Sequence, residues 1–312
     1  MLPFSKGMEL QAAEGSASTQ RLVSHGAAVV FLKRYWPTIV LVVLMSILYG
    51  EVIRYLIADW YKNGDDAHGF FVLAVSAYLV WRKRKVLPEI DAKPSLAGLP
   101  VVLGSLGLLF LGHLGAEFFL SRVSLLTIII GVVVYFRGWQ TVRVLAFPFA
   151  FSLLMIPLPG VIYYQIVFPL QLLTSRLAIF GLECLNLFPV IREGNLLFLP
   201  HHTLEVVEAC SGVRSLMALL ALALGYGYLA ESSKLIRGLL VLLVVPLAIL
   251  SNALRVMIQA VIARYQGVDI TDRSWHQTTG MLTFLSAALL MLLADRLLNS
   301  VRRPAKAALQ TS

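Results

Sequence analysis

The chain has 312 residues, of which 58% are apolar and 14% are charged, and its mean hydropathy is +0.80. Soluble domains carry about 25% charged and about 45–50% apolar residues, so this composition excludes a single water-soluble globule and indicates an integral membrane protein. The formal net charge is +9, and in a membrane protein such an excess of Lys and Arg reports orientation rather than nucleic-acid binding. The two cysteines, Cys184 and Cys210, form no metal-binding or disulfide pattern.

Apolar runs with basic flanks predict about eight transmembrane helices, since a helix needs roughly 17–25 residues to cross a bilayer. In chain order the predicted spans are 37–57, 66–81, 96–119, 123–136, 142–158, 212–230, 235–261 and 279–298. The predicted fold class is therefore an all-α polytopic membrane protein. We expect a single transmembrane domain over residues 35–298, between a tail at 1–34 and a tail at 299–312.

The distribution of basic residues predicts which way the helices run. With the N-terminus inside, 17 of the 26 Lys and Arg residues fall on the inner side, including the run Arg82–Lys85 after the second span. Cytoplasmic loops are enriched in basic residues, so both tails are predicted to be cytoplasmic. Residues 158–211 and 263–278 are then predicted to face outward.

The outward segment 158–211 is the longest connection, and long connections with structure of their own are usually functional. Apolar residues recur at three- and four-residue spacing from Ile162 to Phe180, which predicts a helix lying along the membrane surface. Residues 190–199 and 203–207 carry strand-type side chains around a central turn, which predicts a small β-hairpin just before the sixth span.

Cys210 lies where this hairpin is predicted to turn into the sixth helix, within Glu208-Ala209-Cys210-Ser211-Gly212-Val213-Arg214. The positive end of the helix dipole and the nearby Arg214 both favour the thiolate form of its side chain. The alternative is that Cys210 is a small buried apolar residue without chemistry, which is how free cysteines commonly behave.

Arg255 and His276 are the other two candidates for chemistry. Arg255 lies near the outer end of the seventh span, and ionisable residues inside a membrane tend to face a cavity or a site. The alternative is an arginine that snorkels to the interface. Asn252, one helical turn earlier on the same face, is placed to orient it. His276 opens the eighth span and can act as a general base or pair with a thiolate if the fold brings it near Cys210; otherwise it is an inert loop histidine.

Cys210, Arg255 and His276 come from three predicted helices, yet all three fall at the outer face. A Cys and His pair performs nucleophilic acyl transfer, and a fixed guanidinium can stabilise the oxyanion. Two other classes stay open at this point. One is a non-catalytic transporter or flippase that uses Arg255, Arg214 and Glu51 as pathway charges, and the other is a polysaccharide polymerase that relies on outward arginines. Neither of them needs Cys210.

Four segments together resemble those of a known family. They are Asp66-Ala67-His68-Gly69-Phe70-Phe71, the stretch from Glu208 to Ser215, Asn252-Ala253-Leu254-Arg255, and His276 with Gly280. With these segments in this order, residues 60–298 resemble the exosortase/archaeosortase family of multipass membrane cysteine transpeptidases.

The resemblance implies a reaction and a role for each candidate residue. It implies that Cys210 is the nucleophile, Arg255 the stabiliser and His276 the acid/base. It implies no cofactor, no metal and no nucleic-acid partner, and it assigns substrate positioning to Arg214, Asn252, His68 and Glu208. The implied substrates are exported proteins with a C-terminal sorting signal of the PEP-CTERM type, in which a short motif, often Pro-Glu-Pro, precedes a membrane helix and a basic tail. Cleavage on the outer face of a bacterial cytoplasmic membrane is implied to give a thioester. A second nucleophile resolves it, which leaves transfer to a lipid or glycan acceptor and plain hydrolysis both open, and systems of this kind commonly accompany exopolysaccharide genes.

Overall fold

The computed structural model describes residues 36, 38–115, 117–199, 202–206, 212–230, 233–266 and 273–310, without the side chains of residues 65, 202, 205, 266, 273–277 and 301–310. The chain divides into two compact units, Met1–Arg54 and Tyr55–Ser312. In the first unit, Arg54 Nη2 donates a hydrogen bond to Glu51 Oε1 over 3.4 Å, and both side chains are exposed. The second unit contains all the candidate site residues.

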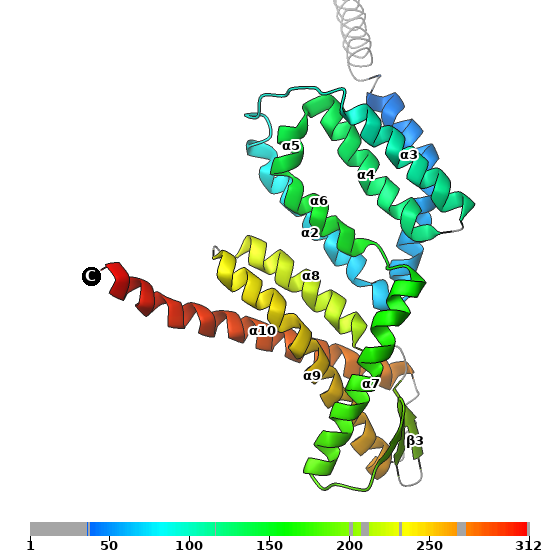
Figure 1. The fold of residues 1–312 in the computed structure, drawn as a ribbon, viewed down its shortest axis with the longest axis vertical. Helices are drawn as coiled ribbons and strands as arrows, with labels where there is room; N and C mark the ends of the chain where they lie inside the picture. Colours follow the sequence, from blue (N-terminus) through cyan, green and yellow to red (C-terminus); the bar gives the residue numbers. More distant parts are fainter. Residues whose placement is uncertain are drawn as a thin grey trace, which may run out of the picture. The chain divides into compact units, whose positions relative to one another are not determined.

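The second unit consists almost entirely of helices (Figure 1). They are η1 Gly64–Asp66, α2 His68–Arg82, η2 Lys83–Lys85, α3 Gly98–Leu114, α4 Phe118–Arg137, α5 Trp139–Val144, α6 Ala146–Ser152, η3 Leu153–Met155, α7 Gly160–Cys184, α8 Val213–Leu229, α9 Lys234–Gln266 and α10 Arg273–Gln310. Within the described residues, five helices are long and apolar enough to cross a membrane: Thr38–Lys62, Phe118–Arg137, Gly160–Cys184, Lys234–Tyr265 and Thr278–Ser300. This confirms the predicted class of an all-α polytopic membrane protein.

The predicted fifth span, 142–158, is wrong as a continuous helix. The chain instead forms α5, which ends at Val144, and then α6. The break follows from Pro148, because a proline has no N–H and its ring collides with the carbonyl group four residues earlier, which is that of Val144. Three other predicted spans are helices of only 15, 17 and 17 residues, namely α2, α3 and α8. The number of eight crossings therefore stays a prediction.

Helix α7 occupies the region predicted to be a surface helix. It extends over 25 residues from Gly160 to Cys184, with Pro169 inside it. Its length and apolar composition are those of a helix that can cross a membrane. The helix itself is confirmed, whereas its position along the membrane surface stays a prediction.

The predicted hairpin is part of a three-stranded antiparallel sheet with the order β1 Ile191–Glu193, β2 Leu196–Leu199 and β3 His202–Glu205. Gly194 begins the two-residue turn between β1 and β2 with φ +63°, a value that glycine adopts without steric cost. Leu197 and Leu199 of β2 are buried among apolar residues of α7 and α9. The sheet is thereby anchored to two helices just before the chain enters α8.

Helices α8, α9 and α10 lie side by side and share a core (Figure 1). Alanines occupy several of the closest positions, among them Ala223, Ala248 and Ala287. Small residues let helix backbones approach closely, which is the usual means of helix association in membranes. This packing fixes the three helices that carry Arg214, Arg255 and His276 relative to one another.

Helix α2 is held by a close contact at Gly69. A Cβ atom at this position would collide with the indole ring of Trp60. Trp60 Nε1 in turn donates a hydrogen bond to the carbonyl oxygen of Met155, 2.9 Å away. The His-Gly-Phe segment therefore needs its glycine so that α2 can pack against Trp60, and this contact sets the position of His68.

Candidate functional site

A cavity of about 570 Å³, which we call the apolar cavity, lies between α2, α8, α9 and α10. Three of the predicted site residues line it: His68 of α2, Arg214 of α8 and Arg255 of α9. Gly280 of α10 lines it as well, and in the sequence this residue belongs to the same family-like segment as His276. Residues that are far apart in the sequence are thus brought together at one place.

Arg255 is buried, with an exposed fraction of 4%. Its Nε donates a hydrogen bond to Thr279 Oγ1 over 3.4 Å, and Gln259 Nε2 donates to the same oxygen over 3.2 Å. A Cβ atom at Gly280 would lie 3.2 Å from Arg255 Nη2, so the guanidinium group lies against the backbone of α10. A snorkelling arginine exposes its charged group to water, and the burial of Arg255 disfavours that alternative.

Asn252 contacts the residue that precedes α8. Gly212 has φ +86°, in the left-handed region, and a Cβ atom there would lie 3.2 Å from both Cβ and Cγ of Asn252. Asn252 is 2% exposed, and its Nδ2 donates a hydrogen bond to Thr174 Oγ1 of α7 over 3.3 Å. Asn252 therefore connects α7 and α9 to the chain that enters α8. Its predicted role of orienting Arg255 stays a prediction.

His68 and Arg214 are the lining residues from α2 and α8 that the sequence singled out. His68 is the first residue of α2, and its Nε2 donates a hydrogen bond to the carbonyl oxygen of Leu154 over 3.0 Å. Arg214 is in the first turn of α8, and a Cβ atom at Gly64 would lie 2.6 Å from its Nη2. The absence of a side chain at Gly64 leaves the space that the guanidinium group occupies.

Three predicted site residues are described only for the backbone or not at all. Cys210 and Glu208 lie outside the described residues. The backbone of His276 is in the first turn of α10, as predicted, and its side chain lies outside the description. Positions 276 and 280 are one helical turn apart and therefore share a face of α10.

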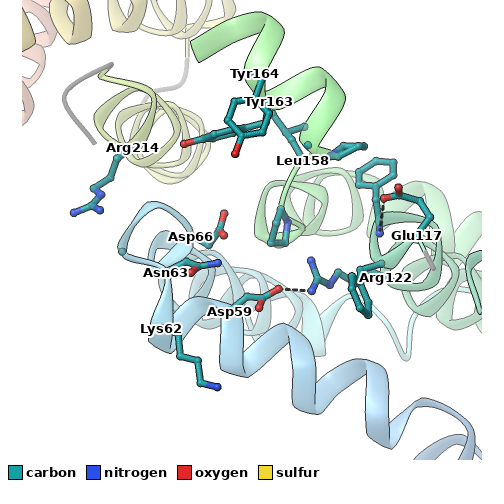
Figure 2. A pocket seen from close by; sticks show the side chains of 16 residues that line it. Asp59, Lys62, Asn63, Asp66, Glu117, Arg122, Leu158, Tyr163, Tyr164 and Arg214 are labelled. Atoms are coloured by element: carbon teal, nitrogen blue, oxygen red, sulfur yellow. Dashed lines mark hydrogen bonds and ion pairs between the residues drawn. The ribbon is translucent and has the colours of Figure 1, made fainter. Parts of the chain in front are cut away.

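A second cavity, of about 660 Å³, adjoins the first and is lined mainly by polar residues (Figure 2), so we call it the polar cavity. Its charged side chains are those of Asp59, Lys62, Asp66, Glu117, Arg122 and Arg214. Gly64 and Arg214 line both cavities, so the two spaces meet at these residues. Figure 2 shows Arg214 on α8 at one side of the cavity, Tyr163 and Tyr164 on α7, and Glu117 beside α4 at the other side.

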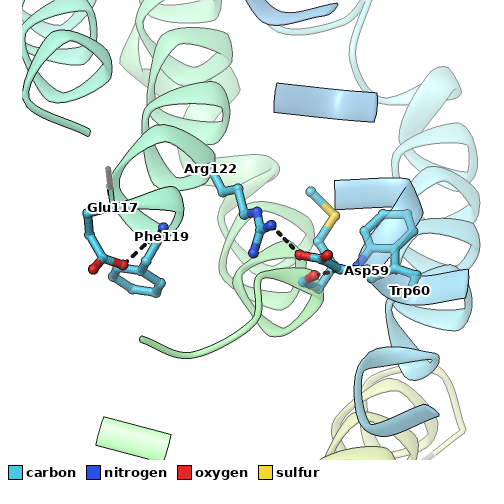
Figure 3. A network of polar contacts seen from close by, with 6 residues as sticks. Asp59, Trp60, Glu117, Phe119 and Arg122 are labelled. Carbon is cyan, nitrogen blue, oxygen red and sulfur yellow. Dashed lines mark hydrogen bonds and ion pairs between the residues drawn. The ribbon is translucent and has the colours of Figure 1, made fainter. Parts of the chain in front are cut away.

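The polar cavity also contains an ion pair that the sequence did not predict. Arg122 Nη2 donates to Asp59 Oδ2 (Figure 3), and the Arg122 side chain is 7% exposed whereas that of Asp59 is 33% exposed. An arginine one turn inside the apolar helix α4 is itself a signal, because ionisable residues in such segments usually have a partner. Its partner, 63 positions away, has no corresponding signal in the sequence.

The described residues contain no group of three or more His, Cys, Asp or Glu side chains that could hold a metal ion. What they do contain is two arginine side chains at one cavity. Arg214 and Arg255 both line the apolar cavity, close to the point where the chain enters α8. Fixed guanidinium groups can stabilise negative charge, such as that of an oxyanion or a carboxylate.

The sequence matches the family described as transmembrane exosortase over residues 60–293. No curated protein matches the chain, and no solved structure does. The matched region covers about three quarters of the chain and includes the sheet, the helices α2 to α9, every lining residue of the apolar cavity and every lining residue of the polar cavity except Asp59. It also includes Cys210, Arg255 and His276. This multipass membrane protein therefore belongs to the transmembrane exosortase family.

Proposed function

We propose that the protein is a membrane cysteine transpeptidase that cleaves the C-terminal sorting signal of exported proteins on the outer face of the cytoplasmic membrane. The observation that carries the proposal is that Arg214 and Arg255 line one cavity beside the start of α8. Cys210 immediately precedes this helix in the sequence. Membership of the exosortase family supports the same class of reaction.

The position of Gly212 supports Cys210 as the nucleophile. Cys210 is two residues before Gly212, and two residues of extended chain span about 7 Å at most. Gly212 contacts Asn252, which is one turn before Arg255 on α9. In the sequence, Cys210 is thus within two residues of a position that packs against the helix carrying Arg255, and this short separation supports its role as the nucleophile.

In the proposed reaction, the Cys210 thiolate attacks the carbonyl carbon of the scissile peptide bond and forms a C–S bond. The negative charge moves to the carbonyl oxygen, where the guanidinium of Arg255 stabilises it. Protonated His276 donates its proton to the departing amine as the C–N bond breaks, which leaves a thioester on Cys210. An acceptor nucleophile then attacks the thioester, gives its proton to His276 and releases the Cys210 thiolate.

Arg255 fits the role of oxyanion stabiliser because its position is fixed before any substrate binds. Its bond to Thr279 and its contact with Gly280 hold it against α10. Donors that are already in place need no reorganisation during the reaction, which is why they lower the barrier. His276 is on the same face of α10 as Gly280, one turn away, and so belongs to the same part of the site.

The experiment that tests the proposal uses a tagged reporter ending in a Pro-Glu-Pro motif, an apolar helix and a basic tail. We expect co-expression with the wild-type protein to shorten the reporter at its C-terminus, as measured by mass spectrometry. Cys210→Ala should abolish the shortening, and Cys184→Ala, which changes the exposed cysteine at the end of α7, should retain it. Shortening that is independent of Cys210 would contradict the proposal. It would favour a transporter, flippase or polysaccharide polymerase, which has no use for the thiol.

A further inference from the structure

The apolar cavity is a groove that runs along two helices. On α8 it is lined by residues Arg214, Ser215, Ala218 and Leu222, and on α10 by Gly280, Met281, Phe284, Leu285 and Ala288. In both helices these positions lie on one face and extend over nine residues, which corresponds to a length of about 12 Å. Both sets begin at the charged end, where Arg214 and Arg255 lie, and continue into apolar residues.

The groove opens sideways along a membrane-crossing helix. Met281 and Leu285 line it and are 60% and 54% exposed, and both lie in the candidate span Thr278–Ser300. Phe71 of α2, on the other edge, is 42% exposed. In a helix that crosses a bilayer, exposed side chains of this kind face the hydrocarbon, so the groove is accessible from within the membrane.

The floor of the groove suits the approach of another helix. Its residues include the small side chains Ser215, Ala218 and Ala288, together with Gly280. Small residues allow two helix backbones to come close, and exposed apolar residues at the edges then pack against the sides of the incoming helix. A single groove of about two turns accommodates one face of one helix.

The polar cavity has a different character and suits an extended chain. Aromatic rings of Phe118 and Tyr164, each 56% exposed, stand in its wall beside Tyr163, and Pro157 and Pro159 line it as well. Grooves with aromatic walls bind extended, proline-containing segments, because such segments lose little conformational entropy on binding. Arg214 lines both this cavity and the groove, and a guanidinium pairs best with a carboxylate.

We propose that the two cavities bind consecutive parts of one polypeptide substrate, with Arg214 at the junction. The groove between α8 and α10 receives the first two turns of the substrate's membrane helix. The polar cavity receives the extended segment before that helix, and an acidic side chain of this segment pairs with Arg214. The proposal rests on the proposed function, and it specifies where the substrate lies and which residue selects its charge.

Photo-crosslinking tests the groove independently of catalysis. Benzoylphenylalanine is introduced at Met281, or at the adjacent Leu282 as a matched control, in the full-length Cys210→Ala protein in membranes. The two side chains are 60% and 59% exposed, but only Met281 lines the groove. After irradiation, we expect severalfold more adduct with the tagged reporter at position 281 than at position 282. Equal adducts at both positions, or an adduct at position 281 with lipid alone, would overturn the proposal.

A charge exchange tests the junction. Arg214→Glu should lose processing of the reporter with an acidic motif residue and should regain it, severalfold over background, when that residue is replaced by lysine. Arg176 is an exposed arginine of α7 that lines neither cavity. The control variant Arg176→Glu should therefore process the acidic reporter normally and the lysine reporter poorly. If Arg214→Glu, present at wild-type level in the membrane, shows no preference for the lysine reporter, Arg214 does not select the charge.

These outcomes are distinguishable from failure of the proposed function. The wild-type protein and Cys210→Ala, assayed on the acidic reporter, show whether Cys210-dependent processing occurs at all. If it occurs while the crosslinks are equal and the charge exchange fails, the substrate lies elsewhere and the function stands. If no processing occurs and position 281 still gives the specific reporter adduct, the groove binds such helices and the assigned chemistry is wrong.

Discussion

Asn252 of α9 packs directly against Gly212, the residue that precedes α8, so that a Cβ atom on Gly212 would lie 3.2 Å from Asn252 Cβ. The contact joins the helix that carries Arg255 to the chain segment that leads from Cys210 into α8. In the sequence, Gly212 is two residues after the proposed nucleophile Cys210, and Asn252 is three residues before the proposed oxyanion stabiliser Arg255. Substitutions at this contact should therefore affect activity even though neither residue reacts.

Gly212→Ala should impair processing. Gly212 has φ +86°, where a residue with a Cβ atom is strained by about 1–2 kcal/mol, and the added atom would also press on Asn252. Gly107→Ala in α3 is the control, because a Cβ atom there meets nothing within 4 Å. The measurement is the rate of reporter shortening in membranes with matched protein levels. Equal rates for the two variants would show that the turn before α8 does not position the site.

Arg255→Lys should lose most activity although the charge is kept. A lysine cannot reproduce the planar fork of donors, and removing one oxyanion donor lowers kcat by about 100-fold or more. Arg237→Lys, nearer the other end of α9, should stay close to the wild-type rate. Single-turnover processing by the purified protein in proteoliposomes measures the effect. A near-wild-type rate for Arg255→Lys would reduce Arg255 to a structural residue.

Thr279→Val should slow processing, and Thr279→Ser should restore it. The Thr279 hydroxyl accepts hydrogen bonds from both Arg255 and Gln259, and leaving a buried donor unpaired costs about 1–3 kcal/mol. Serine keeps the hydroxyl oxygen, whereas valine keeps only the shape. A positioning role predicts a lower kcat with little change in KM.

Thr283→Val, one turn further along α10, is the control, because the Thr283 hydroxyl donates to the carbonyl oxygens of Thr279 and Gly280 in its own helix. Equal effects at both positions, or no recovery with serine, would exclude this role.

Asp59→Asn should lower the Tm of the protein in detergent. It leaves the buried Arg122 guanidinium without its carboxylate, and an unpaired buried group costs about 1–3 kcal/mol of unfolding free energy. Asp59→Asn combined with Arg122→Met should recover part of the loss, because the unpaired charge is then gone. Glu51→Gln removes a pair whose side chains are 58% and 70% exposed, and it should leave the Tm unchanged. A Tm equally insensitive to Asp59→Asn would mean that the pair does not stabilise the fold.

Cys210 should react with a membrane-impermeant maleimide from the outer side. The Cys184→Ala background makes Cys210 the one remaining cysteine of the chain, so the label reports its side of the membrane. We expect labelling in cells whose outer membrane alone is permeabilised. Labelling that requires lysis of the inner membrane would reverse the predicted orientation.

Much of the helical architecture can be predicted from composition and periodicity. The predicted spans 235–261 and 279–298 lie within α9 and α10. A long apolar run in a membrane forms a helix because its backbone has no other way to satisfy its hydrogen bonds. One proline hardly changes the average hydropathy of an apolar run. The break between α5 and α6, which Pro148 causes, was therefore not predicted.

The candidate site is predictable in part. The place of Arg255 in an apolar helix indicates a functional residue, and its 4% exposed fraction agrees with that interpretation. The contact of Asn252 with Gly212 and the pair of Arg122 with Asp59 join residues 40 and 63 positions apart. Such contacts depend on how the helices pack, which the pattern within each helix does not encode. The groove between α8 and α10 depends on packing in the same way.

The most direct test of the central claim is to trap the proposed thioester with hydroxylamine. Hydroxylamine attacks the thioester carbonyl, breaks the C–S bond, and leaves a hydroxamate at the new C-terminus of the reporter while it restores the Cys210 thiol. With the wild-type protein we expect mass spectrometry to find this hydroxamate immediately before the membrane helix of the reporter, and with Cys210→Ala we expect none. A shortened reporter that carries no hydroxamate in the wild type, or the same product with Cys210→Ala, would contradict covalent catalysis by Cys210.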